Sequence, residues 1–235
     1  MNLIRKFMII ATMTSTVCAF ANEKIEPPAM ESYNKLPWKF YESHPKVKIY
    51  TKEVPGSDLI AFKGEMTMKA PLHRILAVMK SPEIRYKWVD RYSGTTLVAK
   101  TSSTDFIEQT VIDMPWPISD RDFVNRTQTK LIGKNLVLIQ INSDLDVAED
   151  PEFVRGYTWN SSFSLRAAEN NQETHVSVEI FADPMGLLPK SLINLIQKRW
   201  PKNTLEAIET VALSKEELSG ASALSDLRKN ANKGH

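Results

Sequence analysis

The sequence predicts an α+β domain in which an antiparallel sheet is followed by a long C-terminal helix. Six stretches with strand-like alternation follow one another between residues 95 and 182, with only turns and loops between them. Consecutive strands without intervening helices favour an antiparallel sheet. A helical apolar pattern then runs from Pro189 to about Ala212. With 235 residues, 42% of them hydrophobic, the chain is long enough to bury a sizeable core in one domain.

The elements before these strands are shorter. Residues 22–37 form a proline-containing leader, with a short helix expected at 30–36. Residues 47–51 and 59–68 alternate as two strands around the turn sequence 55–58, which predicts a hairpin. Pro71 is tolerated in the first turn of a helix and opens an apolar helical pattern, and a second short helix carries Ile84 and Trp88.

The main strands are separated by turn residues and by one long acidic loop. The six predicted strands are Thr95–Lys100, Asp105–Asp113, Asp122–Lys130, Asn135–Asn142, Val154–Ala167 and Thr174–Ala182. The loop Ser143–Phe153 is long enough to be functional. Pro201 should bend or divide the C-terminal helix near Trp200, and residues 214–235 are expected to form a flexible tail.

The N-terminus has the order of a secretory signal peptide. Two basic residues, Arg5 and Lys6, precede an apolar run of 14 residues, and Ala19-Phe20-Ala21 fits a cleavage site. The run is shorter than the ~20 residues that span a bilayer, which disfavours a membrane anchor. We therefore expect residues 1–21 to be removed and the protein to be exported, to the periplasm in a Gram-negative source and otherwise into the medium. Lipid attachment at Cys18 is the alternative.

Charge and composition exclude several classes. Removal of residues 1–21 takes two of the 30 basic residues and none of the 28 acidic ones, which leaves no formal net charge and no basic signal for nucleic-acid binding. The only cysteine lies in the removed segment, the four histidines are scattered, and no phosphate loop or hydrolase motif is present. We expect no metal, no cofactor and no catalytic residue.

Polar and aromatic side chains share the same faces of the predicted strands, and this mixture indicates a cavity. Phe106 and Glu108 share one strand face, and Phe123 shares another with Asn125 and Thr127. A solid core rejects unpaired polar groups at a cost of about 1–3 kcal/mol each. A binding pocket, in contrast, needs a few of them to orient a ligand.

The strongest motif is Pro115-Trp116-Pro117, followed by Arg121-Asp122-Phe123-Val124. Two prolines around a tryptophan force a break before the next strand. This string resembles the signature of the START lipid-transfer family. Val154-Arg155 and the stretch 183–194 are similar to other parts of the family, and the resemblance covers residues 38–212.

The resemblance implies a helix-grip fold, in which a curved antiparallel sheet wraps around a long C-terminal helix with an internal hydrophobic cavity. We place this domain at residues 38–213. The family also implies a monomer that binds a single lipid or other hydrophobic molecule without a covalent bond and contacts membranes transiently. The helix Pro189–Ala212 and the loop Ser143–Phe153 would gate the cavity. Eleven residues are predicted to line it: Phe106, Glu108, Phe123, Asn125, Thr127, Tyr157, Trp159, Phe163, Leu188, Leu192 and Leu195. Arg121 and Asp122 are assigned structural roles.

The residue six positions after Arg121 differs from the one found in the sterol-binding members of the family. Those relatives pair a buried carboxylate with an arginine six residues after the signature arginine. Glu108 occupies the place of the carboxylate, but the sixth residue after Arg121 is Thr127, and Arg126 falls on the opposite strand face. Glu108 would then be neutral through burial or bonded to Thr127 or Asn125.

Two other functions remain open from sequence. Helix-grip relatives include cyclases and aromatases, which use the same cavity to fold a reactive substrate. Glu108 is the only acid or base that the sequence offers for such chemistry. The third option is an envelope protein that binds another protein through its surface.

Overall fold

The structure is a computed structural model that describes residues 30–233, so the predicted signal peptide and Cys18 lie outside the described residues. The strands are β1 (Lys39–Ser43), β2 (Val47–Glu53), β3 (Ile60–Met68), β4 (Tyr92–Ser102), β5 (Asp105–Ile112), β6 (Arg121–Ile132), β7 (Leu136–Ser143), β8 (Val154–Thr158), β9 (Ser161–Ala167), β10 (Thr174–Ile180) and β11 (Ala182–Asp183). The helices are α1 (Met30–Lys35), α2 (Leu72–Met79), η1 (Pro82–Lys87), α3 (Lys190–Leu213), η2 (Ser219–Ser222) and α4 (Ala223–Lys233).

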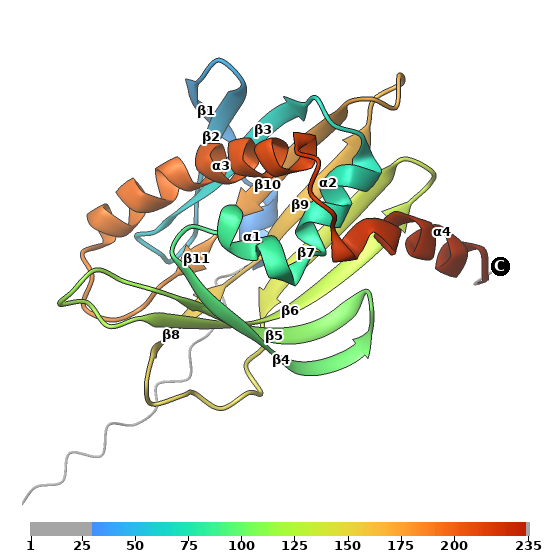
Figure 1. Cartoon of the computed structure of the whole chain (residues 1–235). Helices are drawn as coiled ribbons and strands as arrows, with labels where there is room; N and C mark the ends of the chain where they lie inside the picture. The colour runs from blue at the N-terminus through green and yellow to red at the C-terminus, as the bar shows by residue number, and fades with distance from the viewer. Residues whose placement is uncertain (1–29, 234–235) are drawn as a thin grey trace, which may run out of the picture.

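The strands form one large sheet that is almost entirely antiparallel. Its order is β1-β2-β3-β10-β9-β7-β6-β5-β4, so the chain crosses once, from β3 to the far edge, and then returns strand by strand. Two short strands lie off this path: β8 pairs in parallel with β6, and β11 pairs with β8. Figure 1 shows α3 lying across one face of the curved sheet, with α2 beside it. The predicted antiparallel sheet with a C-terminal helix is confirmed.

One predicted strand is wrong. The stretch Val154–Ala167 is not continuous, because Asn160 adopts a φ of 43°, in the left-handed region, and divides it into β8 and β9. β8 leaves the main path to lie beside β6, whereas β9 enters the sheet between β7 and β10. As a result, the residues before Asn160 lie beside β6, and those after it lie between β7 and β10.

The helix α3 is fixed to the sheet by a close backbone approach. A Cβ atom on Gly64 in β3 would lie only 2.7 Å from the Cβ atom of Pro201. Pro201, Leu205 and Ile208 are buried on this face of the helix. The proline does not divide α3, which runs without interruption from Lys190 to Leu213. Glycine at position 64 is therefore what allows the helix to cross β3 at this distance.

Residues 214–233, for which the sequence analysis expected a flexible tail, contain η2 and α4. Leu218, Leu224 and Leu227 are buried in the main core cluster beside α2. The Arg74 guanidinium group donates to the carbonyl oxygens of Ala212, Ser214 and Glu216, which ties the chain after α3 to α2. The small polar residues between the leucines concealed this pattern in the sequence. In the part of the chain that the structure describes, none of the helices is long and apolar enough to span a bilayer.

Candidate functional site

A cavity of about 260 Å³ lies between the sheet, η1 and α3. Its lining is mostly apolar and comes from β5, β6, β7, β9 and β10 together with the helices. The large apolar side chains at its wall are Trp88, Phe106, Ile112, Phe123, Ile139, Ile141, Phe163, Ile180 and Trp200. The sheet and the terminal helix therefore leave a space between them instead of filling it completely.

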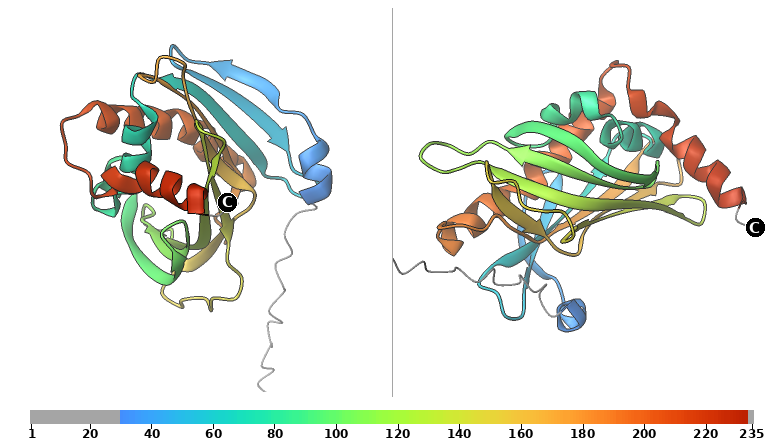
Figure 2. Two further views of the ribbon diagram at one scale, coloured as in Figure 1. Left: turned by 90° about the vertical axis from the view of Figure 1, so that its right-hand side faces the viewer. Right: turned by 90° about the horizontal axis from the view of Figure 1, so that it is seen from below.

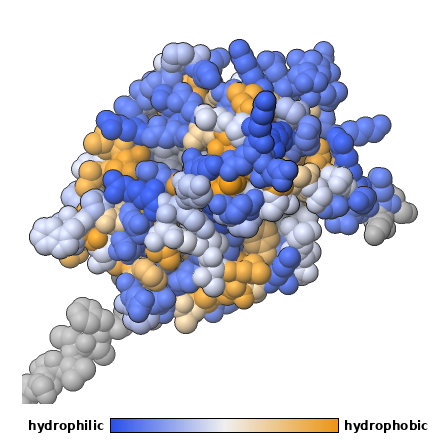
Figure 3. Space-filling view, viewed as in Figure 1, coloured by the Kyte–Doolittle hydropathy of each residue, from blue (hydrophilic) through white to orange (hydrophobic). Residues whose placement is uncertain are grey.

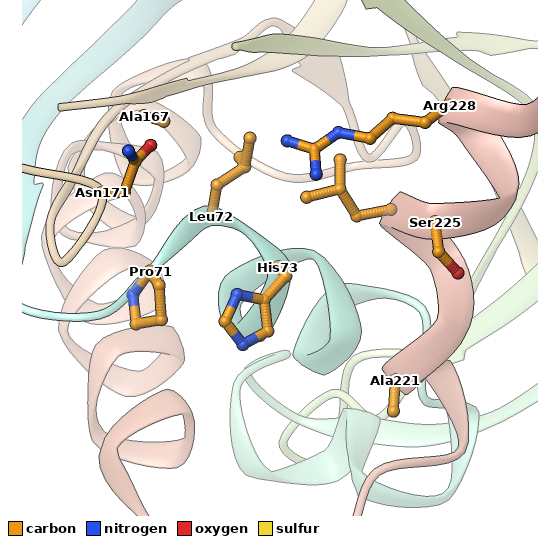
Figure 4. A pocket seen from close by; sticks show the side chains of 9 residues that line it. Pro71, Leu72, His73, Ala167, Asn171, Ala221, Ser225 and Arg228 are labelled. Atoms are coloured by element: carbon orange, nitrogen blue, oxygen red, sulfur yellow. The ribbon is translucent and has the colours of Figure 1, made fainter. Parts of the chain in front are cut away.

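A larger hollow of about 680 Å³ is a separate surface feature (Figure 4). It lies between α2, α4 and the turn after β9, and His73, Asn171 and Arg228 line it. It shares no lining residue with the cavity under α3. Its larger size thus does not make it the ligand site that the fold surrounds.

Six of the eleven predicted lining residues border the cavity. They are Phe106, Glu108, Phe123, Asn125, Thr127 and Phe163. All six lie on β5, β6 and β9, where the alternation of side chains determines which residues share a face.

The other five predicted lining residues lie elsewhere. Tyr157 and Trp159 stack on each other with ring centroids 5.7 Å apart, in a second core cluster near α1, and Leu188 packs against the same cluster. Leu192 and Leu195 are exposed on α3. The break at Asn160 explains the first two, and the rotation of α3 explains the last two, because the helix presents Gln197 and Trp200 to the cavity.

Glu108 has a cationic partner that the sequence analysis did not identify. Its Oε1 atom accepts a hydrogen bond of 2.8 Å from an Nη atom of Arg85, on η1, and both side chains are largely buried. The expected bonds to Thr127 or Asn125 are not formed. Arg126 lies on the outer strand face, as predicted, where it pairs with Asp105 at 2.7 Å. The cavity therefore contains a carboxylate–arginine pair whose arginine comes from a helix instead of the next strand.

A second cation lies next to this pair. The Nζ atom of Lys80 donates to Thr129 Oγ1 at 2.7 Å and lies 5.0 Å from the centre of the Phe106 ring. The pKa of Lys80 is lowered to about 8, chiefly because of burial; the charge of Glu108 opposes this shift and the positive charge of Arg85 adds to it. Lys80 therefore still carries a charge at neutral pH, in a place where that charge is poorly solvated.

Several buried polar atoms of the cavity wall have no hydrogen-bond partner. They are the Nε atom of Arg85, the indole Nε1 atom of Trp88 and the Oε1 atom of Gln197. Sequence reasoning missed all three residues. The sequence offered one signal for Arg85 and Trp88: they are three residues apart, with Arg85 on the short helix η1 and Trp88 directly after it.

The Arg121-Asp122 motif lies outside the cavity and holds loops together. Arg121 donates to the carbonyl oxygens of Ser119, Pro184 and Met185, which joins the loop before β6 to the loop before α3. Asp122 is fully buried and accepts hydrogen bonds from Arg155 on β8 at 2.8 and 3.0 Å. Gln109 donates to the same carboxylate oxygen at 2.8 Å. Among residues 30–233, no group of side chains is arranged to hold a metal ion.

A sheet that partly surrounds a C-terminal helix, with an apolar cavity between them, defines a class of small-molecule-binding domains. A family model for the START domain matches residues 29–215, and the chain belongs to this family. Both η2 and α4 lie beyond the matched range.

Three individual proteins are similar to this chain. PA1579, a Pseudomonas aeruginosa protein of uncharacterized function, is 26% identical over 176 residues, which cover 74% of this chain and 86% of that protein. The crystal structure of a STAR-related lipid transfer protein fragment from Xanthomonas axonopodis is similar with a TM-score of 0.66 and 22% identity, over 75% of this chain and 99% of the fragment. Human StAR-related lipid transfer protein 5 gives a TM-score of 0.68 and 17% identity, over 78% and 90% of the two chains. These similarities confirm the helix-grip fold.

Proposed function

We propose that this protein binds a single lipid or other hydrophobic molecule, without a covalent bond, in the cavity under α3 and carries it between membranes. The observation that carries the proposal is the mostly apolar cavity of about 260 Å³ in a START-family chain. Ligand pockets commonly measure about 300–1,000 Å³, so this volume suits one chain or a compact ring system better than a two-chain lipid. Burial of each methylene group contributes about 0.8 kcal/mol, which offsets its removal from a membrane.

The proposed gate is α3, because its residues Gln197 and Trp200 close one side of the cavity. The sequence analysis proposed the loop at residues 143–153 as the second part of the gate, but none of its residues borders the cavity. Its carbonyl oxygens at Val147 and Ala148 instead accept hydrogen bonds from Arg155. The proposal of a moving gate therefore depends chiefly on α3.

Exposed apolar side chains near the start of α3 support membrane contact. Trp116 is 93% exposed in the loop before β6, and Leu187, Leu195 and Ile196 are exposed in and after the loop before α3. The two loops lie at the same end of the molecule in both Figure 1 and the right-hand view of Figure 2. Apolar surface is visible at this end in Figure 3. An exposed tryptophan with several aliphatic residues suits a membrane–water interface.

The ligand itself provides the test of this proposal. Protein purified gently from its own cells should show, in native mass spectrometry, a population heavier than the chain by the mass of one lipid. Partial denaturation should release that mass. Protein that stays free of lipid after gentle purification, and also binds none from mixed vesicles, would contradict the proposal.

The carrier proposal makes a specific prediction for Glu108→Gln. The substitution keeps the size of the side chain but removes the charge that faces Arg85. A carrier should keep its fold and its binding capacity and change only its preference among head groups, whereas a cyclase-like enzyme would lose turnover. Lipid binding by both forms, measured in parallel with product analysis of the bound molecules, checks this. Chemical conversion of a bound lipid by the wild type but not by Glu108→Gln would favour the enzyme.

We further propose export, on the basis of the signal-peptide pattern at residues 1–21. In a Gram-negative source the mature chain would lie in the periplasm. N-terminal sequencing of the native protein should begin at Asn22, and an intact Met1 end would contradict export.

A further inference from the structure

Three charged groups of the cavity, Lys80, Arg85 and Glu108, lie at a boundary between two hollows. A second hollow, of about 420 Å³, adjoins the cavity and is covered by the segment containing η2 and α4. Five residues line both spaces: Met79, Lys80, Arg85, Phe106 and Glu108. A molecule with its chain in the cavity could therefore place a polar head group at this boundary, under the C-terminal segment.

Positive charge is in excess at the boundary. Lys80 and Arg85 are two cations, and Glu108 is the only carboxylate among the residues that both hollows share. Glu179 also borders the cavity, but its charge acts on Tyr33 and Lys52, which belong to other contacts of the sheet. On the outer side of the second hollow, Asp226 lies beside Lys229 at 3.5 Å, and Lys100 is exposed. Two positive charges thus face one carboxylate, and the partly buried Lys80 forms no salt bridge among the described residues.

Hydrogen-bond donors are also in excess. The Nε atom of Arg85 and the Nε1 atom of Trp88 are buried and have no acceptor. A buried donor without a partner destabilises the protein, because it has lost its hydrogen bonds to water. An oxygen-rich anionic group at the boundary would accept from the Nε atom of Arg85 and compensate the charge of Lys80 at the same time.

We propose that the ligand is a single-chain amphiphile with an anionic head group, a carboxylate or a phosphate, that binds between Lys80 and Arg85. The apolar chain then occupies the cavity of about 260 Å³. This inference depends on the proposed carrier function and narrows it to a ligand class. Glu108 orients Arg85 through the hydrogen bond of 2.8 Å, while Lys80 supplies the uncompensated charge.

Amphiphiles with the same chain and different head groups test this inference. Palmitate and hexadecyl phosphate would be titrated below their critical micelle concentrations and hexadecanol below its solubility limit, with the fluorescence of the cavity residues Trp88 and Trp200 as the signal. Because a hydrogen bond to a charged group contributes about 1.5–3 kcal/mol, at least one of the anions should bind about tenfold or more tightly than hexadecanol. The comparison between palmitate and hexadecyl phosphate shows whether the source is a free fatty acid or a phosphorylated lipid.

A matched pair of variants locates the effect. Lys80→Met should remove most of the preference for the anion over hexadecanol. Lys130→Met removes the same charge from an exposed position on β6 and should retain the preference. Circular dichroism establishes that both variants are folded, and the comparison of head groups on the wild type does not depend on either variant.

The outcomes separate this inference from the function on which it depends. Binding of hexadecanol as tightly as both anions would overturn the anionic head group but leave the carrier function intact. An equal loss of preference in Lys80→Met and Lys130→Met would overturn the site at the boundary. Absence of binding by all three probes would overturn the carrier function itself.

Discussion

Replacement of Asp122 by alanine should lower the free energy of unfolding by about 3–5 kcal/mol, the usual effect of removing one partner of a buried ion pair. The carboxylate is fully buried, and the side chain of Arg155 is only 5% exposed. One carboxylate oxygen of Asp122 accepts hydrogen bonds from Arg155 and from Gln109. The substitution therefore leaves a buried guanidinium group without compensation. Urea unfolding followed by circular dichroism measures the loss.

Two controls test whether the uncompensated charge of Arg155 causes the loss of stability in Asp122→Ala. The pair of Asp105 and Arg126 has the same chemistry at the protein surface, so Asp105→Asn should destabilise far less. The double variant Asp122→Leu with Arg155→Met should recover much of the loss, because removal of both charges is often neutral. An Asp122→Ala loss below about 1 kcal/mol would mean that the pair is not a structural requirement.

Replacement of Thr127 by tryptophan should abolish most lipid binding while the protein still folds. Thr127 is buried on β6, and its side chain borders the cavity. An indole ring at this position would fill part of a space of about 260 Å³ and compete with the ligand chain. We expect the affinity for a bound lipid to fall at least about tenfold, or roughly 1.4 kcal/mol of binding free energy. Overpacking should destabilise the fold by no more than about 1–3 kcal/mol.

Lys130→Trp is the matched control for this prediction. It introduces the same side chain on the same strand, but on the exposed face that does not border the cavity. Equilibrium binding to a fluorescent lipid should therefore be unchanged in Lys130→Trp and strongly reduced in Thr127→Trp. Unchanged binding in Thr127→Trp would place the ligand somewhere else.

The predicted site residues that border the cavity are those whose positions follow from strand alternation. Phe106 and Glu108, like Phe123, Asn125 and Thr127, lie two residues apart along a strand, and a strand turns alternate residues to the same face. Their arrangement depends only on local geometry. The same rule failed at Tyr157 and Trp159, because a single residue with a positive φ, Asn160, ended the strand between them and Phe163.

The parts that the sequence could not predict depend on contacts between distant segments. The approach of Pro201 to Gly64 determines which face of α3 is turned toward the sheet. Helical spacing alone does not reveal this contact, so it could not show that Leu192 and Leu195 are exposed. The partner of Glu108 is Arg85, which is 23 residues away in the chain and on another kind of element. Such a pair becomes visible only when η1 is packed against β5.

The most direct test of the central claim is a crystal structure of the wild-type protein with a bromine-labelled single-chain lipid. The claim is that the sheet and α3 enclose a space that admits a lipid chain. It predicts an anomalous bromine peak inside the cavity, in the region bordered by Ile139, Phe163 and Trp200. Bromine peaks only at the molecular surface, with these three side chains closed on one another, would contradict it.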